Sequence, residues 1–473
     1  MADLKKGDLQ RRVTELEKKV ETLKGELAEK ERLLTSMYTS KTWKLGQLYG
    51  RLFGMESFWR EKISSFAKKI FGIRPRNKWN TIISSPVRAT DRHYQTLLEF
   101  ISHITLGKGI FVMIARPKIV EGIGFRAEEL NYRVVGLANE FSKEGVRILY
   151  VFTEQKEGVS LDHIERVSEN ILQMSIQLFF KTFEFFFERI NSFSTNKVLF
   201  IHRLHPCVVE IVCCANAYNW TTVYDILDNW EEFSKAGWLT EWYSRDLEEF
   251  VVSNADIKIA VSYFLQRKFN YSGNVHIVHN GYYPDSLNVP VKNLKQGEVT
   301  AGYFGSLEKY RFDWDLLLSI AERHKDWLFY LIGRMPRNIR LRENIISLGT
   351  LHPTELYAYA QNWDVALLPF KVNNLTISCD SLKVYEYLSF RLPVVARGVG
   401  EHVRNYPYVY IAETERDFEK YITIAASTRI EEDKITDFLR TSDWSSRAKE
   451  ILTIVQSGKP NYKEYIFESP LHT

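Results

Sequence analysis

Lys383 and Glu386 are the two residues of this sequence whose types and spacing point most directly to chemistry. They lie three positions apart in residues 381–389, an amphipathic stretch that predicts a helix, and an apolar strand follows from Pro393. Because residues three apart share one helix face, an ammonium and a carboxylate are presented together. If this helix begins at the carboxyl edge of a sheet, Lys383 would meet phosphates and Glu386 the hydroxyls of a sugar or ribose. The alternative is a solvated ion pair on a helix surface.

Three further residues in the same half of the chain follow apolar runs and suit a phosphate site. Gly305 and Ser306 come directly after the run 299–304, and a glycine there lets the backbone approach a diphosphate. Arg334 comes soon after the run 327–332, where an arginine can grip phosphate oxygens through two hydrogen bonds. A single glycine is a weaker signal than GxGxxG, and Arg334 could equally be a surface arginine.

The first half of the chain offers candidates for moving a proton or binding an acceptor. His202 and His205 follow one apolar run, while Asp225 ends the next run and Asp228 comes three residues later. A carboxylate or imidazole at the carboxyl end of a strand can take a proton from an acceptor hydroxyl. We therefore name Asp225 and Asp228 as candidate catalytic residues and the two histidines as candidate acceptor contacts. The alternatives are hydrogen-bonded structural histidines and an Asp228 that caps the following helix.

Metal and cofactor chemistry is not favoured by the sequence. Asp313-Trp-Asp315 could hold a divalent ion, but it falls where a helix should begin, and acidic residues in a first turn suit the helix dipole. We therefore predict no obligatory metal and no cofactor. The cysteines show neither CxxC pairs nor metal-ligand spacing, which indicates reduced thiols in a cytosolic protein. They are Cys207, Cys213, Cys214 and Cys379.

The elements that must position these residues are predicted by two series of apolar runs alternating with helical stretches. The series are separated by the mostly polar stretch 288–298. Apolar runs of this kind predict parallel sheets covered by helices on both faces. The prediction is an α/β protein with two Rossmann-like, doubly wound domains, residues 106–290 and 291–457, followed by a tail, 458–473. Ligands would then bind between the carboxyl edges of the two sheets.

Length and composition limit the classes of function. The 473 residues exceed one core, and 45% hydrophobic with 26% charged residues describes a globular protein with sizeable cores. A net charge of +4 is too small to indicate nucleic acid as the main partner. No secretory signal is visible at the N-terminus and no uninterrupted apolar run of about 18 residues appears. These features predict a cytoplasmic protein.

The N-terminal residues 1–38 predict a coiled coil. Hydrophobic residues alternate at spacings of four and three, with Lys30 as the polar interruption, and valine and leucine at the two seam positions favour a parallel pair of helices. A lone helix this polar is marginal in water, so we expect a homo-oligomer through this arm. A hairpin within one chain is the alternative. The seam residues are Leu9, Val13, Leu16, Val20, Leu23, Leu27, Leu34 and Met37.

Residues 39–105 predict a basic, aromatic, helical linker. Within 41–78, ten Lys and Arg residues stand against two Glu, interleaved with Trp, Phe and Leu. This composition is typical of a helix that lies in an anionic membrane surface. The alternative is a connecting helix that packs its aromatic face on the next domain.

Residues 108–457 resemble the GT-B glycosyltransferases, close to family 4 and to enzymes of bacterial cell-surface polysaccharide synthesis. The preceding coiled coil and linker also resemble arms found on bacterial members. The motifs that carry the resemblance occur in order along the chain. They are residues 224–228, 255–256, 261–262, 278–281, 302–305, 331–333, 364–370, 382–388 and 393–395.

The resemblance implies that the second domain holds a nucleotide-sugar donor, with Glu386 on the ribose hydroxyls and Lys383 at the diphosphate. Arg133 fills the place of an arginine in the opening helix of the first domain, which would bind the acceptor. Family 4 enzymes usually carry a glutamate eight positions before Glu386, and this chain has Ser378 there. The donor sugar and a retaining or inverting outcome therefore stay open. The donor-binding candidates are Gly305, Ser306, Arg334, Thr376, Lys383, Tyr385 and Glu386, with Asp380 as a further substitute for the glutamate.

Two functions remain as hypotheses. The first is a hexosyl- or deoxyhexosyltransferase that moves a sugar from a nucleotide-sugar to a lipid-linked glycan acceptor, peripheral on the inner face of the cell membrane. The second is a catalytically silent GT-B fold that serves as a coiled-coil scaffold in a glycan assembly complex. The missing glutamate and the long arm motivate the second, whereas Lys383 and Glu386 favour the first.

Overall fold

The computed structural model describes residues 87–104, 109–119, 132–154, 160–193, 195–237, 243–283 and 290–457. These all fall within one compact unit, Ser85–Thr473. The predicted coiled coil, most of the basic linker and the tail lie outside the described residues. Among the described residues, no helix combines the length and the apolar character needed to cross a membrane.

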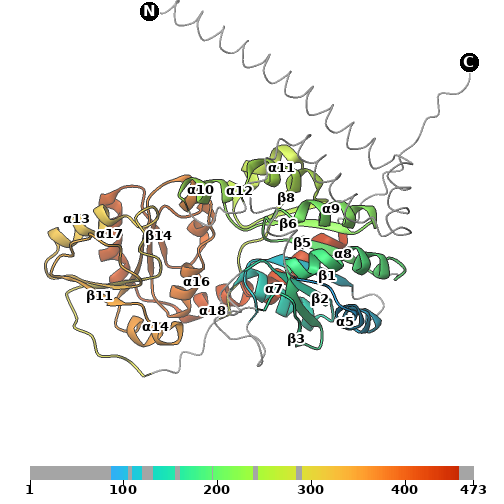
Figure 1. The fold of residues 1–473 in the computed structure, drawn as a ribbon. Helices are drawn as coiled ribbons and strands as arrows, with labels where there is room; N and C mark the ends of the chain where they lie inside the picture. Colours follow the sequence, from blue (N-terminus) through green and yellow to red (C-terminus); the bar gives the residue numbers. More distant parts are fainter. Residues whose placement is uncertain are drawn as a thin grey trace, which may run out of the picture. The chain divides into compact units, whose positions relative to one another are not determined.

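The first domain is built on an eight-stranded sheet in the order β3-β4-β2-β1-β5-β6-β7-β8 (Figure 1). All described pairings are parallel except that between β3 and β4 at one edge. The strands are β1 Ile110–Ala115, β2 Arg147–Phe152, β3 Ile164–Ser168, β4 Ile171–Ser175, β5 Lys197–Ile201, β6 Thr221–Ile226, β7 Ile257–Ala260 and β8 Val275–Ile277. The helices are α5 Asp91–Ser102, α7 Arg133–Lys143, α8 Ile176–Asn191, α9 Val208–Ala217, α10 Trp230–Lys235, α11 Arg245–Asn254 and α12 Tyr263–Phe269.

The second domain is built on a six-stranded, all-parallel sheet in the order β11-β10-β9-β12-β13-β14. The strands are β9 Thr300–Phe304, β10 Leu328–Ile332, β11 Ile345–Gly349, β12 Val365–Pro369, β13 Val394–Arg397 and β14 Val409–Ile411. The helices are α13 Trp314–Arg323, α14 Pro353–Ala360, α15 Asn374–Ile377, α16 Leu382–Ser389, α17 Glu415–Ala426 and α18 Glu432–Thr441, and the chain then continues into α19 Trp444–Ser457. The prediction of two doubly wound domains is therefore confirmed.

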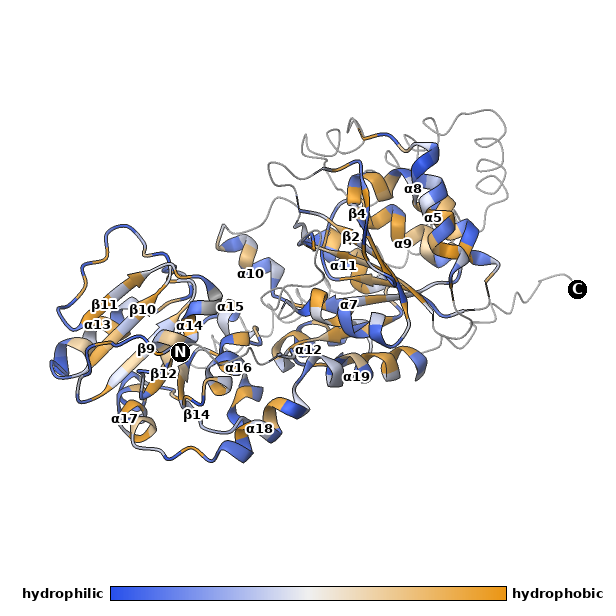
Figure 2. Cartoon of the chain, turned by 90° about the horizontal axis from the view of Figure 1, so that it is seen from below, coloured by the Kyte–Doolittle hydropathy of each residue, from blue (hydrophilic) through white to orange (hydrophobic). Residues whose placement is uncertain are grey.

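The central strands read as continuous apolar runs because helices cover both faces of each sheet. Every residue of β1, β2, β9, β10 and β12 is buried. In Figure 2 the strands β10 and β12 are coloured mostly as hydrophobic, whereas the helices show both hydrophobic and hydrophilic colours. The antiparallel edge strand β3, which is only partly buried, was not expected from the sequence.

The last helix, α19, belongs by packing to the first domain although the sequence assigned it to the second. Its buried residues Trp444, Ala448, Ile451 and Val455 join the hydrophobic core that surrounds β1 and β2. Helix α19 lies beside α7, as Figure 2 shows. Gly281 is required at the contact, because a Cβ there would lie 2.8 Å from the Trp444 ring. The chain thus crosses back to the first domain after α18.

Candidate active site

Lys383 lies directly against Gly305, and both residues are candidates that the sequence offers for a phosphate site. Gly305 directly follows β9 and has a φ of +133°, and a Cβ there would overlap the Lys383 side chain. Gly333 directly follows β10 and has a φ of +149°, and a Cβ there would overlap the Gly305 carbonyl oxygen. Only glycine fits this backbone conformation without strain and allows so close an approach. The two strand ends and the start of α16 are therefore drawn tightly together around the Lys383 ammonium.

Lys383 is a positive charge held without a close counterion. Burial lowers its pKa, the neighbouring Glu386 opposes this, and Arg311 lowers the pKa further. Among the described residues, Lys383 has no ion pair within 4 Å. A half-buried ammonium beside a second cation is an arrangement that a bound anion would stabilise.

Arg311 is the site residue that sequence reasoning missed. It lies between β9 and α13, its guanidinium carbon is 5.7 Å from the centre of the Phe370 ring, and its Nη2 donates to Cys379 Sγ at 3.6 Å. The only local signal was an arginine in the segment that Gly305 begins. Arg334, which the sequence favoured, is exposed and makes no ion pair among the described residues. A role for Arg334 in donor binding stays a prediction.

Asp228 faces residues of the second domain. It follows β6, and the Cys379 thiol donates to its Oδ1 at 3.6 Å. Burial raises the pKa of Asp228 to about 6, while Arg311, Cys379 and Arg203 hold it from rising further. A carboxylate with this pKa is mostly ionised at neutral pH and still basic enough to accept a proton.

Asp225 is set apart from Asp228 by its partners. It is fully buried; Arg133 donates to Oδ2 through Nε and to Oδ1 through Nη2, both at 2.9 Å, and His202 Nδ1 lies 2.9 Å from Oδ2. Burial alone would raise the pKa of Asp225, but Arg133 and His202 lower it to about 2. Both oxygens are occupied, which favours Asp228 over Asp225 as a proton acceptor.

The predicted acceptor contacts Arg133, His202 and His205 all lie in the interior of the first domain. Arg133 also donates to the carbonyl oxygens of Val278 and His279, each at 3.0 Å, so it ties α7 to the end of β8. His205 is fully buried, and burial together with Arg203 lowers its pKa to about 3, so the ring is neutral. These contacts support structural roles, and contact with an acceptor stays a prediction.

The segment that replaces the expected glutamate is a contact between the two domains. Ser378 is fully buried, its hydroxyl donates to Leu375 O at 3.0 Å, and its carbonyl oxygen accepts from Ser262 Oγ at 2.6 Å. The Thr376 hydroxyl donates to Lys371 O at 2.5 Å. The hydroxyls of Thr376 and Ser378 are therefore already satisfied by the backbone.

Asp380 joins the same contact between domains. It accepts from Asn280 N at 2.6 Å and lies 3.0 Å from His402 Nε2. The fully buried Tyr385 has its hydroxyl 2.7 Å from that of Tyr406 and 3.3 Å from Asp380, which indicates a packing role. Ser306 accepts from the Tyr303 hydroxyl through its carbonyl oxygen at 2.8 Å.

Two groups of possible metal ligands are relevant to the prediction that no metal is required. Asp313 caps α13, accepts from Leu316 N at 3.2 Å and pairs with Arg397 at 3.0 Å, as expected for a helix start. His279, Asp380 and His402 have ligand atoms within 4.8 Å of one another. The two imidazoles stack with centres 4.2 Å apart and 14° between planes, so their in-plane lone pairs do not converge on one ion. Metal independence stays a prediction.

Two Rossmann-like domains with facing sites at the ends of their strands, and a last helix that returns to the first domain, define the GT-B fold of glycosyltransferases. This confirms the resemblance at the level of the fold. No family model matches the chain. The sequence is 23% identical to TuaH of Bacillus subtilis (strain 168), a glycosyltransferase provisionally assigned to teichuronic acid biosynthesis. That match covers 45% of this chain and 64% of TuaH, so it spans less than two thirds of the relative.

Solved structures share the fold at low sequence identity. Sucrose-phosphate synthase of Thermosynechococcus elongatus superposes with a TM-score of 0.55 at 13% identity, covering 74% of this chain and 98% of that one. HepE of Anabaena, solved with UDP and glucose, gives 0.50 at 11% identity over 73% and 99%. A UDP-forming trehalose-phosphate synthase of Burkholderia vietnamiensis gives 0.51 at 11% identity over 76% and 99%.

Proposed function

We propose that this protein is a glycosyltransferase that moves a sugar from a nucleotide-sugar bound in the second domain to a glycan acceptor bound in the first. The observation that carries the proposal is the packing of Lys383 against Gly305, with Arg311 and Glu386 close by and Asp228 across the domain junction. These contacts support a donor side with two cations, where the Glu386 carboxylate would bind hydroxyls. Asp228, in the first domain, would accept the proton.

The donor half of the reaction depends on charge. As the bond between sugar and diphosphate breaks, negative charge grows on the diphosphate oxygens, and fixed cations in a water-poor site stabilise it strongly. Lys383 and Arg311 supply this charge, and the bare backbone at Gly305 lets the diphosphate come close. Glu386 accepts hydrogen bonds from the ribose hydroxyls. These groups make a metal unnecessary, so we expect activity to survive chelation.

The acceptor half depends on Asp228. An attacking hydroxyl must lose its proton as the new glycosidic bond forms, and a carboxylate with a pKa of about 6 can take it. This role supports inversion of configuration, because in a retaining reaction the departing phosphate can accept the proton instead. Arg311 influences the electrostatics of both Lys383 and Asp228, so it links the leaving group to the base.

UDP is the favoured nucleotide, because the HepE structure with the same fold holds UDP and glucose. The likeness to TuaH supports a polymer of the cell surface as the acceptor. We further propose that the acceptor is lipid-linked and that residues 41–78 hold the protein at an anionic membrane. Flotation with anionic liposomes should fall when 41–78 are deleted, and equal partitioning would refute this. Deleting residues 1–36 should lower the mass measured by light scattering, and an unchanged mass would refute pairing between chains.

Calorimetric titration of UDP, GDP and dTDP tests the proposal directly. We expect one nucleotide to bind wild type and to bind Glu386→Ala about tenfold or more weakly, because a charge-assisted hydrogen bond to ribose is lost. Lys383→Gln should weaken binding through the diphosphate, so uridine should bind both forms alike. The second candidate function is the catalytically silent scaffold, because Ser378 replaces the expected glutamate and its hydroxyl and carbonyl groups are hydrogen-bonded within the protein. Binding of no nucleotide at millimolar concentration would establish the scaffold instead.

A further inference from the structure

Two arginines emerge side by side at the carboxyl edge of the first sheet. Strands β1 and β5 are adjacent and parallel, with Ile114 paired to Ile201. Arg116 lies two positions after Ile114, and Arg203 lies two positions after Ile201. Between them, His202 N donates a hydrogen bond to Ile114 O at 2.9 Å. The ladder thus continues to the residues before the arginines, so their backbones leave the sheet at the same level.

The position of this pair within the sheet is the place where such folds bind ligands. From β1 the strand order runs outward through β2 to β4, and from β5 it runs outward the other way through β6 and β7. The order therefore reverses between β1 and β5. In doubly wound sheets, the loops after the strands that flank this reversal diverge and leave a crevice for a ligand. Arg116 and Arg203 flank the reversal point of the acceptor domain.

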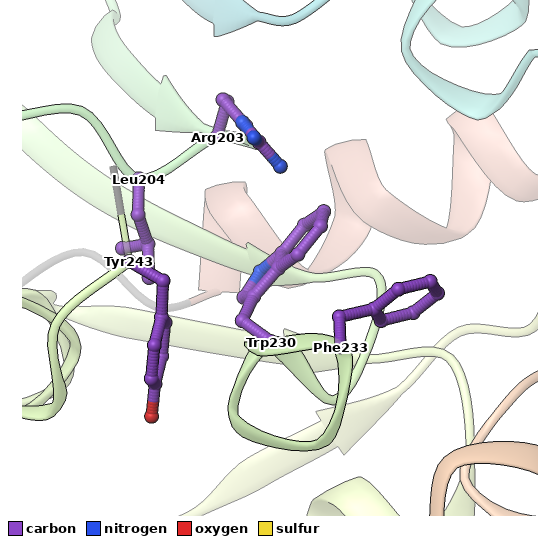
Figure 3. Close-up of a pocket in the computed structure, with 5 residues that line it drawn as sticks. All are labelled: Arg203, Leu204, Trp230, Phe233 and Tyr243. Carbon is purple, nitrogen blue, oxygen red and sulfur yellow. The ribbon is translucent and has the colours of Figure 1, made fainter. Parts of the chain in front are cut away.

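The Arg203 guanidinium is held in place by an aromatic ring. Its central carbon lies 4.7 Å from the centre of the Trp230 ring, and the side chain is only 7% exposed. Figure 3 shows Arg203 directed toward Trp230 in a small pocket that Leu204, Phe233 and Tyr243 complete. Cation–π attraction holds a guanidinium at this distance from an aromatic ring, and its planar fork of N–H groups can bind one carboxylate or phosphate through two hydrogen bonds.

The electrostatics at this edge favour a negative ligand. Burial lowers the pKa of Arg203 to about 10, and the nearby charge of Arg116 acts in the same direction, because like charges disfavour each other. Arg116 is exposed and has no ion pair within 4 Å among the described residues. Asp228 attracts Arg203 but is also engaged by Arg311 and Cys379. An anion between the arginines would relieve their repulsion.

We infer that Arg116 and Arg203 bind an anionic group of the acceptor, either a sugar carboxylate or a phosphate, beside the hydroxyl that attacks the donor. This inference rests on the proposed function and names its substrate class. Asp228 follows the neighbouring strand β6, so the anion and the proton acceptor lie on adjacent strand ends. The acceptor is thus positioned by its charge, while its hydroxyl meets Asp228.

Calorimetric titration of the full chain saturated with UDP tests the inference. The probes are methyl β-D-glucuronide, glucose 1-phosphate and the neutral methyl β-D-glucoside, each also titrated without nucleotide. We expect at least one anionic probe to bind wild type about tenfold or more tightly than the glucoside, because charge-assisted hydrogen bonds form only with the anion. Preference for the glucuronide or for the phosphate identifies the source of the charge.

Variants separate a binding role from a structural one. Arg116→Gln changes an exposed side chain and should abolish the preference for the anion while UDP binding is retained. Arg203→Lys keeps a charge but loses the planar guanidinium beside Trp230, and should weaken binding of the anionic probes only. The exposed Arg429→Gln, on the second domain, is the charge-matched control and should bind as wild type.

The outcomes distinguish this inference from the proposed function. The inference is overturned if UDP binds but the three probes bind alike, if no anionic probe binds, or if Arg116→Gln keeps the preference. Loss of all nucleotide binding would instead refute the donor site, whereas the titrations without nucleotide would still report on the two arginines.

Discussion

The side chain of Lys383 occupies the space where a Cβ of residue 305 would lie, so the glycine and the lysine are present as a matched pair. Gly305 has a φ of +133°, a conformation that residues with a side chain rarely adopt. The consequence is a bare stretch of backbone beneath an ammonium. That combination suits a diphosphate, which needs both positive charge and close approach.

Gly305→Ala should therefore weaken nucleotide binding, whereas a control variant with similar backbone strain should lose stability only. The new methyl group displaces Lys383, and we expect about a tenfold or greater loss of UDP affinity by calorimetry. The matched control is Gly273→Ala, which has a φ of +100° but nothing within 4 Å of the new Cβ. Both variants should lose about 1–2 kcal/mol of unfolding free energy from backbone strain. Equal UDP binding by the two variants would contradict the proposed pairing.

Asp228 should control the pH dependence of transfer. Its pKa is raised to about 6, so the ionised base is lost as the pH falls through 6. The rate should therefore rise with pH to a plateau above about 7, and Asp228→Asn should lower kcat by about 10²-fold or more. The exposed Asp315→Asn is the control and should keep both the rate and the profile. A flat profile in wild type would indicate that the leaving phosphate accepts the proton.

Cys379 should affect catalysis by changing the pKa of Asp228, without contacting the substrate. Its thiol donates to Asp228 Oδ1 at 3.6 Å, and this contact lowers the pKa of Asp228. Cys379→Ala removes the donor, so the acidic limb of the pH profile should move to higher pH while the plateau rate changes little. Cys213→Ala, in helix α9, is the matched cysteine control. A lower plateau with an unmoved limb would show that Cys379 acts on packing instead.

The Arg133 and Asp225 pair should contribute to stability in a pH-dependent way. The folded pKa of Asp225 is lowered to about 2 from its usual 3.8, so its contribution is present above about pH 4 and is lost as the pH falls through 2. Asp225→Asn should cost about 3 kcal/mol or more in urea unfolding at pH 7, because Arg133 stays buried without its counterion. The control is Asp437→Asn, whose partner Arg440 is also exposed. The surface variant should change stability by less than about 1 kcal/mol.

Because α19 packs on the first domain, we expect Trp444 to stabilise that domain rather than the second. Trp444 is fully buried among residues of that domain, so Trp444→Ala should cost about 3–5 kcal/mol of unfolding free energy. Hydrogen exchange should show the loss of protection in β1 and β2 before β9 and β10. Preferential exchange in the second domain would contradict the assignment of α19. Ile424→Ala, at an exposed position of α17, should change little and serves as the control.

The sequence by itself determined the features that depend on neighbouring residues. Continuous apolar runs such as 197–201 and 328–332 must be covered on both faces, which predicts parallel strands and two doubly wound domains. Gly305 after one such run and Lys383 near the start of a helix were found because strand ends and helix starts have local signals. The α/β class and one half of the proposed donor site follow from these signals.

Only the tertiary structure decided which charged residues meet. Asp225 and Asp228 are three positions apart, and the sequence does not distinguish their roles. In the structure, Arg133 donates hydrogen bonds to both carboxylate oxygens of Asp225, whereas burial raises the pKa of Asp228 to about 6. The sequence favoured Arg334 because it closely follows a strand, and a strand end has a local signal. Arg311 was missed because it lies in a loop between β9 and α13, and no local signal shows where such a loop folds. The packing of α19 on the first domain was hidden for the same reason. Amphipathic periodicity says that a helix face is buried, but the partner that buries it is chosen by the folded chain as a whole.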